Sequence, residues 1–433
     1  MNLICEFVNL NFEFYYLDNG VRVMLVPISG VQSVALGVYV RAGTRDETEK
    51  NNGIAHFLEH MVFKGSKNYS TPESMMVLEA TGGYKNAGTA QEYTMYEAKL
   101  PADKFDLGLD ILSDIVLNPL LKDIDIQKEK NTILEEIKRR HDQSEELVVE
   151  EFFHLRGLTT LGTPESVKVL SKGQFDSYHQ SNYTSANIVI CVTGKFDPAS
   201  VKHKISQAFL KLPKNPINTW SPPIKLTGPL IKIIEKPDEK QVQLVLGGEA
   251  FGMTDPRRFA LAVLFRILDF GLSGRLFKAI RIDRNLAYSI NAGTDLDSDH
   301  GSWLVTAGVS PENLKELILI VLKELKKLKD SPLKESELAD AKEKVRVPLL
   351  FSLESPLSQM EFYAQQALFR PQEILTHEQA IEKVKAVTTA EVQSVARDLF
   401  VTSNLNLVLV GPVSKFDIRI SDLYDIIQRG NNF

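Results

Sequence analysis

The segment VQSVALGVYVRAG (residues 31–43) is a mostly apolar, strand-like run that leads into a helical pattern. A similar segment, KQVQLVLGGEAF (240–251), does the same in the second half of the chain. A second pair of similar segments is TSANIVICVTG (184–194) and TSNLNLVLVGP (402–412). The order and spacing of these segments are kept while most side chains differ. The sequence therefore predicts two similar α/β domains of about 210 residues each, with two unrelated α/β domains as the alternative.

Further elements are predicted around these segments. A hairpin with its turn at Asn19-Gly20 is expected over 12–27, and strands over 32–41 and 189–193. Helical patterns lie near 53–64, 72–81, 103–116, 124–142, 146–156 and 198–210. Residues 212–229 hold five of the 19 prolines and little periodicity, which predicts an extended connection. We therefore expect one domain over 1–211, a linker over 212–229 and a second domain over 230–433.

Composition excludes several classes of protein. Of the 433 residues, 43% are hydrophobic and 24% charged, which is typical of a globular protein and not of a disordered one. No run approaches the roughly 20 apolar residues of a membrane span, and no Lys or Arg precedes Arg22, so neither a span nor a signal peptide is expected. A net charge of −6 disfavours nucleic acid and anionic membranes. Two cysteines, Cys5 and Cys191, suit a reducing compartment, and the cytoplasm is the predicted location.

The helical pattern GIAHFLEHMVF (53–63) carries the first candidate site. His56 and His60 are four residues apart and fall on one helix face, and Glu59 flanks that face. The pattern is the inverted form of the HExxH zinc motif. Two imidazoles supply two of the three protein ligands of a catalytic zinc ion, and Glu59 can accept the proton of a water molecule. A chance match is the alternative, and two ligands do not complete a site.

A third ligand is expected on the helix EKNTILEEIKRR (129–140). Glu129, Ile133 and Glu136 share one face at spacings of four and three residues, whereas Glu135 points away from it. Glu136 is therefore the better ligand, with Glu129 as a carboxylate that supports the ligands. Taken alone, a helix this rich in glutamate is usually solvated.

These motifs resemble a known family. RAGTRDE (41–47), GIAHFLEHMVFKGS (53–66) and TGGYKNAGTAQEYTMYEAKLP (81–101) resemble the pitrilysin/insulinase family of zinc peptidases, closest to its two-domain branch with the mitochondrial processing peptidase β subunit and bacterial processing-type peptidases. The family pattern puts the last ligand at Glu136 and an additional acidic residue that supports catalysis at Glu129. The resemblance implies an α+β fold of two similar domains, each a mostly antiparallel sheet packed with helices, that form one half of a clamshell.

The resemblance extends to SGRLFKAIRIDRNLAYSINAG (273–293). Arg281 and Tyr288 match an Arg/Tyr pair that donates hydrogen bonds to the substrate carbonyl and the oxyanion; a merely structural role is the alternative. Asn285 stands where relatives often have Gly, and Asn also adopts the left-handed conformation, so the turn is expected to survive. Asn86 and Ala87 match the family's edge strand, whose backbone pairs with the substrate chain. An ordinary turn into a strand is the alternative there.

The predicted function is that of a zinc-dependent metalloendopeptidase that hydrolyses unfolded peptides or short extended segments within a closed chamber. One Zn²⁺ per chain is expected on His56, His60 and Glu136, with Glu59 as general base. The alternative is a non-catalytic assembly subunit of the same fold, like the relatives that serve as core proteins of a respiratory complex. Inactive relatives typically lose one or more of the site residues, which are all present in this sequence.

The resemblance also bears on assembly. In single-chain family members, zinc lies in the first of four such domains, and the Arg/Tyr pair belongs to the last domain of the other half. This chain carries both sets, so we expect a homodimer in which each subunit completes the site of the other. A heterodimer with a related subunit is the alternative. Peptides are the expected substrates; nucleic acids and membranes are not expected partners.

Overall fold

The computed structural model describes residues 7–9, 12–217, 219–221, 223–226, 228–416 and 418–432. Cys5, which contributed to the predicted compartment, lies outside the described residues, and Cys191 is a buried free thiol. The chain forms two compact units. The first comprises 1–137, 158–221 and 351–376, and the second 138–157, 222–350 and 377–433.

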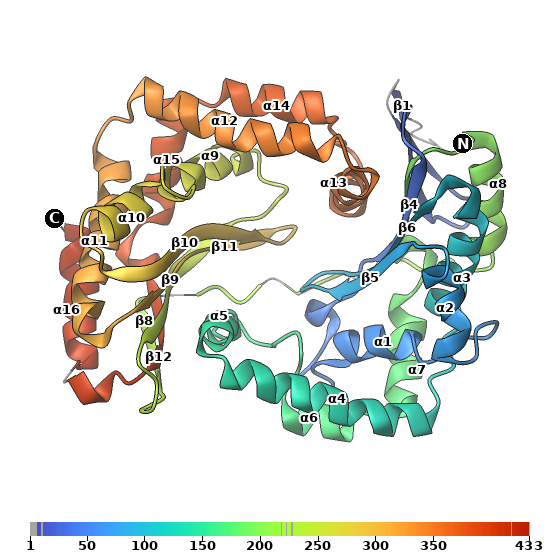
Figure 1. Cartoon of the computed structure of the whole chain (residues 1–433), viewed down its shortest axis with the longest axis horizontal. Coiled ribbons are helices and arrows are strands. Elements are labelled where there is room, and N and C mark those ends of the chain that lie inside the picture. The colour runs from blue at the N-terminus through green and yellow to red at the C-terminus, as the bar shows by residue number, and fades with distance from the viewer. Residues whose placement is uncertain are drawn as a thin grey trace. The chain divides into compact units, whose positions relative to one another are not determined.

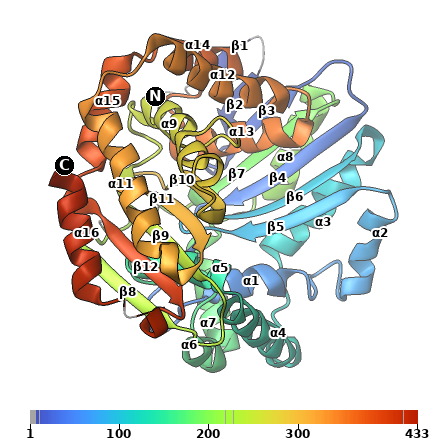
Figure 2. The same ribbon diagram turned by 60° about the vertical axis from the view of Figure 1, so that its left-hand side comes forward.

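The first unit is built on a seven-stranded sheet. Its strands, in spatial order, are β1 (Phe7–Asn9), β2 (Phe12–Tyr16), β3 (Arg22–Pro27), β7 (Ile188–Gly194), β4 (Ser33–Val40), β6 (Thr94–Pro101) and β5 (Tyr84–Thr89). Only the β3–β7 pairing is parallel among the described strands of this sheet. Figure 2 shows β7, β4, β6 and β5 side by side in this order. The predicted hairpin over 12–27 is confirmed as β2 and β3, and the strand over 32–41 as β4.

The second unit repeats this topology with five strands. They are, in spatial order, β10 (Ala287–Leu296), β11 (His300–Val309), β9 (Val242–Phe251), β12 (Asn406–Gly411) and β8 (Leu230–Glu235). β12 pairs parallel with β8 and antiparallel with β9, as β7 does with β3 and β4. Gly194 and Gly411 end the two equivalent strands at positive φ, where a Cβ would lie 2.4 Å from the oxygen of Ser33 and 2.6 Å from that of Gln241. The predicted repeat of two similar α/β domains is therefore confirmed.

Helices pack on both sheets (Figure 1). Helices that belong wholly or mainly to the first unit are η1 (Thr44–Asp46), α1 (Ile54–Val62), η2 (Pro72–Met75), α2 (Met76–Glu79), η3 (Ala102–Lys104), α3 (Phe105–Leu117), α4 (Asp123–Asp142), α6 (Pro164–Val169), α7 (Lys172–Asn182), η4 (Ser185–Asn187), α8 (Pro198–Phe209) and α13 (Pro356–Phe369). Those of the second unit are α5 (Ser144–His154), α9 (Arg258–Leu268), α10 (Arg275–Phe277), η5 (Lys278–Ile282), η6 (Pro311–Asn313), α11 (Leu314–Asp330), α12 (Glu335–Ser352), α14 (His377–Ala386), α15 (Thr389–Leu399), η7 (Thr402–Asn404), η8 (Ser414–Phe416) and α16 (Ile420–Asn432). The helices expected from the sequence are all found, with ends shifted by a few residues.

Two helices make the units discontinuous in sequence. α13 packs on β7, β4 and β3 of the first unit, where Met360 and Tyr363 join an apolar cluster with Tyr39. α5 packs on β12 and β9 of the second unit, where Phe152 joins a cluster with Val408. Each helix thus covers the second apolar face of a sheet that lies far away in sequence. The compact units therefore differ from the continuous ranges 1–211 and 230–433 that we expected.

The predicted linker contains one of the five points at which the chain passes from one unit to the other. Its described residues before β8 form neither helix nor strand, as expected, and residues up to 221 belong to the first unit. None of the described helices is both long enough and apolar enough to span a bilayer.

Candidate metal centre

Helix α1 fixes the positions of the two histidines. It follows Gly53, which has φ +91°, and a Cβ there would lie 2.6 Å from the backbone oxygen of Leu161. Leu58 and Met61 are buried in the core of the first unit and anchor one face of the helix. On another face the rings of His56 and His60 lie one turn apart, with centroids 4.6 Å from each other.

Helix α4 brings a carboxylate to these rings. Glu136 Oε2 lies 3.8 Å from His56 Nε2 and 3.9 Å from His60 Nε2. Tetrahedral zinc with bonds of about 2.0–2.1 Å separates its ligand atoms by roughly 3.4 Å, so a small adjustment of the side chains accommodates the ion. Glu135 is exposed on the other side of α4. The three residues expected as ligands are therefore brought together, and their donor set suits zinc.

Glu129 makes a hydrogen bond with His60 at the ring nitrogen that does not face Glu136. Its Oε1 lies 2.8 Å from His60 Nδ1, and its Oε2 lies 2.6 Å from Lys64 Nζ. Burial by itself would raise the pKa of Glu129, but the hydrogen bonds from His60 and Lys64 outweigh burial and lower it. An ionised Glu129 accepts the Nδ1 proton of His60 and so leaves the Nε2 lone pair, on the Glu136 side, available for a metal ion.

Glu59 lies beside the two histidines on α1, and its carboxylate is hydrogen-bonded to a residue of the first sheet. The Thr89 hydroxyl, at the end of β5, donates a hydrogen bond of 2.8 Å to Glu59 Oε2. Burial raises the pKa of Glu59, whereas the hydrogen bond from Thr89 and the charge of His60 act in the opposite direction. A raised pKa brings a carboxylate nearer to the range in which it exchanges protons efficiently. The sequence did not point to Thr89, whose only signal is its place after the edge-strand motif.

A second residue that the sequence did not indicate is Glu47, a buried glutamate in the loop before α1. Glu47 Oε2 accepts hydrogen bonds of 2.8 Å from Asn52 Nδ2 and from the Gly53 backbone N–H. Glu47 Oε1 accepts a third, also 2.8 Å, from the Ala55 N–H. The carboxylate thus binds the unpaired N–H groups at the N-terminus of the helix that carries both histidines.

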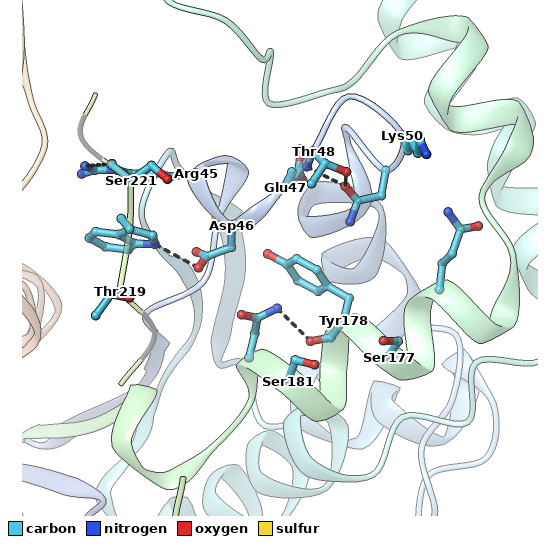
Figure 3. A pocket seen from close by; sticks show the side chains of 14 residues that line it. Arg45, Asp46, Glu47, Thr48, Lys50, Ser177, Tyr178, Ser181, Thr219 and Ser221 are labelled. Carbon is cyan, nitrogen blue, oxygen red and sulfur yellow. Dashed lines mark hydrogen bonds between the residues drawn. The ribbon is translucent and has the colours of Figure 1, made fainter. Parts of the chain in front are cut away.

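A polar cavity of about 710 Å³ adjoins this loop (Figure 3). Arg45, Asp46, Glu47 and Tyr178 line it, and Trp220 closes one side. Trp220 Nε1 donates a hydrogen bond of 2.9 Å to Asp46 Oδ1, and the Arg45 guanidinium lies 4.7 Å from the centroid of the indole. The first part of the predicted linker is therefore attached to the loop that precedes α1.

Arg281 and Tyr288 lie next to each other in the second unit. The Arg281 guanidinium carbon is 5.4 Å from the centroid of the Tyr288 ring, and Tyr288 is 78% exposed at the start of β10. Both line a cavity of about 430 Å³. Asn285, between them, has φ +53°, so the expected left-handed turn is present. The pair and the three candidate ligands belong to different units.

Asn86 and Ala87 lie on β5, the outermost strand of the first sheet. Asn86 is exposed, whereas Ala87 packs against the core below the sheet. The outer backbone edge of β5 pairs with no other described strand. An edge of this kind can accept a further strand.

Two family models match consecutive parts of the chain. Residues 22–164 match the family model "Insulinase (Peptidase family M16)", and residues 170–345 match the model "Peptidase M16 inactive domain". The chain is 32% identical over 410 residues to the uncharacterized zinc protease YmxG of Bacillus subtilis, covering 92% of this chain and 98% of that protein. The chain belongs to the insulinase family, peptidase family M16.

A second relative and two solved structures are also similar to this chain. An uncharacterized zinc protease of Mycobacterium tuberculosis is 30% identical over 407 residues, which cover 92% of each chain. Among solved structures, a protease from Helicobacter pylori superimposes with a TM-score of 0.85 at 21% identity, covering 93% of this chain and 99% of that one. A chain of complex III2 from Candida albicans gives a TM-score of 0.82 at 19% identity, covering 96% and 99%. At these identities the two structures show a shared fold alone.

Proposed function

We propose that this M16 family member is a zinc-dependent metalloendopeptidase that holds one Zn²⁺ per chain and cleaves unfolded peptides or short extended segments. The observation that supports this most is the grouping of His56, His60 and Glu136, with Glu129 hydrogen-bonded to His60. When bound, zinc lowers the pKa of water and polarises a carbonyl group. Glu59 accepts a proton from the attacking water and returns it to the leaving amine.

The other predicted residues act on the peptide. The backbone of β5 at Asn86 and Ala87 binds the substrate as an added strand, which makes few demands on its sequence. Arg281 and Tyr288 donate hydrogen bonds to the oxyanion that develops on the scissile carbonyl. The enzyme works as a homodimer, with a heterodimer as the alternative, in a closed chamber. The cytoplasmic location expected from cysteine usage stays a prediction.

A non-catalytic assembly subunit is the second candidate, because the fold is also that of a chain in complex III2 from Candida albicans. The retained site favours the enzyme. A subunit that only assembles has no need of two histidines and a carboxylate grouped within 4.8 Å of one another. Nor does it need a buried second carboxylate that orients one of the rings.

The test compares the wild type with Glu59→Gln on a denatured proteome, with cleavage sites profiled by mass spectrometry. Glu59→Gln should keep its zinc and its fold but cleave at least about a hundredfold more slowly, as expected for a lost general base. Glu135→Gln, a change of the same kind at an exposed position on α4, is the matched control and should cleave at the wild-type rate. Full activity in Glu59→Gln, or none in a zinc-loaded wild type, would contradict the proposal.

A further inference from the structure

One face of the first sheet carries a buried carboxylate that has no cationic partner among the residues described by the structure. Glu97 on β6 is 1% exposed, and its Oε2 atom has no hydrogen-bond partner in the described part of the chain. Asn86 on β5 makes a hydrogen bond with the Glu97 side chain. Lys99 lies two residues further along β6 on the same face, yet it makes no ion pair with Glu97 among the described contacts. Among the described residues, Glu97 therefore has no ion-pair partner.

A second unpaired polar atom lies beside it. Gly37 on β4 is directly opposite Glu97, and a Cβ on Gly37 would lie 2.6 Å from Tyr39 Cε2 and 2.9 Å from Met360 Sδ. The Tyr39 ring and α13 therefore cover the sheet next to Glu97. Tyr39 is 1% exposed, and its hydroxyl also has no partner among the described residues. Buried polar groups are costly to leave unpaired, so a ligand group that makes hydrogen bonds with these two atoms would be stabilised.

The charge of this cluster selects the kind of ligand. Glu361 follows Met360 on α13 and is exposed. Burial raises the pKa of Glu97, and the charge of Glu361 raises it further. The same two carboxylates, after burial, raise the pKa of Tyr39. Two acidic groups that repel each other become favourable when a cation lies between them. An ammonium or guanidinium group would supply that charge and donors for the unpaired oxygens.

The edge strand determines where such a cation would come from. Asn86 is paired with Glu97 across β5 and β6, so the two side chains share one face of the sheet. Tyr84, 46% exposed, lies on the same face of β5. A peptide added to the free edge of β5 would place every second side chain on this face. Two strand spacings, about 10 Å, separate that peptide from β6, and a Lys or Arg side chain together with a Glu side chain spans this distance.

We propose that Glu97 and Glu361 form a subsite for one Lys or Arg side chain of a peptide that binds as an added strand on β5. This inference rests on the proposed function, because it gives the peptide-binding edge a preference for a basic residue. Asn86 moves aside or shares the cation, and Tyr39 closes the inner wall of the subsite.

A measurement of peptide binding tests this inference independently of catalysis. In the Glu59→Gln background, fluorescence anisotropy measures the affinity of labelled, otherwise neutral peptides in which one Arg is moved along the chain. Each peptide has a twin with citrulline, the neutral analogue of Arg, at the same position. Arg should bind about tenfold more tightly than citrulline at one position and not at the positions next to it, because neighbouring side chains point to the opposite face.

The double change Glu97→Gln/Glu361→Gln should reduce this Arg-to-citrulline ratio to about one. Glu165→Gln, an exposed glutamate on α6, is the matched control and should keep the ratio. An Arg preference that is equal at every position would reflect general attraction to an acidic protein and would overturn the subsite, as would a preference that survives the double change. If the wild type cuts no peptide while the periodic preference is present, the proposed function fails and the subsite stands.

Discussion

At the residue scale, two adjacent glutamates on α4 have opposite surroundings. Glu136 faces both histidine rings within 4 Å, whereas Glu135 is exposed. The two side chains are chemically identical and one residue apart, so the same substitution at each of them changes net charge and helix propensity equally. A difference between the two variants therefore tests the assignment of the third ligand.

Glu136→Gln should weaken zinc binding by at least about tenfold, because an amide is a poorer ligand than a carboxylate and brings no charge. Glu135→Gln should bind zinc like the wild type. Competition with a chromogenic chelator gives both affinities, and circular dichroism checks that the fold is kept. The assignment is wrong if Glu135→Gln loses zinc and Glu136→Gln retains it.

Much of this site could be predicted from residue spacing. His56, Glu59 and His60 lie within one helical turn or little more, and the shared face of Glu129 and Glu136 follows from the buried Ile133 between them. Thr89 and Glu47 could not be found in this way. Their hydrogen bonds join residues on different elements, and no local period of the sequence records which loop lies next to which helix.

At the scale of elements, α1 depends on the loop before it. Glu47 receives three N–H hydrogen bonds at the N-terminus of α1, and the same loop is attached to Trp220 through Asp46. The orientation of α1 in turn fixes both histidines. Zinc binding is therefore expected to depend on a residue that does not contact the metal site.

Glu47→Ala should lower the free energy of unfolding by about 2–4 kcal/mol, because it leaves two buried backbone N–H groups unpaired and removes one of the two hydrogen bonds of the Asn52 amide. It should also weaken zinc binding, since α1 loses its anchor. Glu49→Ala, in the same loop but exposed, should change neither property. Urea unfolding of the zinc-free protein and chelator competition measure the two effects. A Glu47→Ala variant that matches Glu49→Ala in both measurements would rule out this role.

Elements could be predicted better than their packing. The helical pattern near 146–156 predicts α5, but such a pattern does not say against which sheet a helix packs. In the structure α5 packs on β12 and α13 on β7, each more than 150 residues away in sequence. These contacts make the compact units discontinuous, which the proline-rich segment 212–229 alone did not indicate.

At the scale of the whole molecule, the two units share one topology but carry different chemistry. The first holds the candidate zinc ligands and the second holds Arg281 and Tyr288. The insulinase family implies that such a pair completes a zinc site on the other half of the assembly. A chain with both sets can do this for a second copy of itself, and two-fold symmetry then produces two equal sites.

Mixing two inactive variants tests this arrangement. Glu59→Gln and Tyr288→Phe homodimers should each be nearly inactive, since one lacks the general base and the other a donor to the oxyanion. If Tyr288 acts on the partner's site, a mixed dimer has both changes in one site and none in the other. Mixing should then restore up to about half of the wild-type activity per mixed dimer.

If Tyr288 acts within its own chain, each site of the mixed dimer carries one change, and activity does not return. Native mass spectrometry establishes that mixed dimers have formed, so that a failure to exchange subunits is not mistaken for this result. The control is a Glu59→Gln/Tyr288→Phe double variant mixed with wild type. If Tyr288 acts on the partner's site, each of the two sites in this mixed dimer carries one change. Recovery in the first mixture together with low activity in the second is expected only when each subunit completes the site of the other.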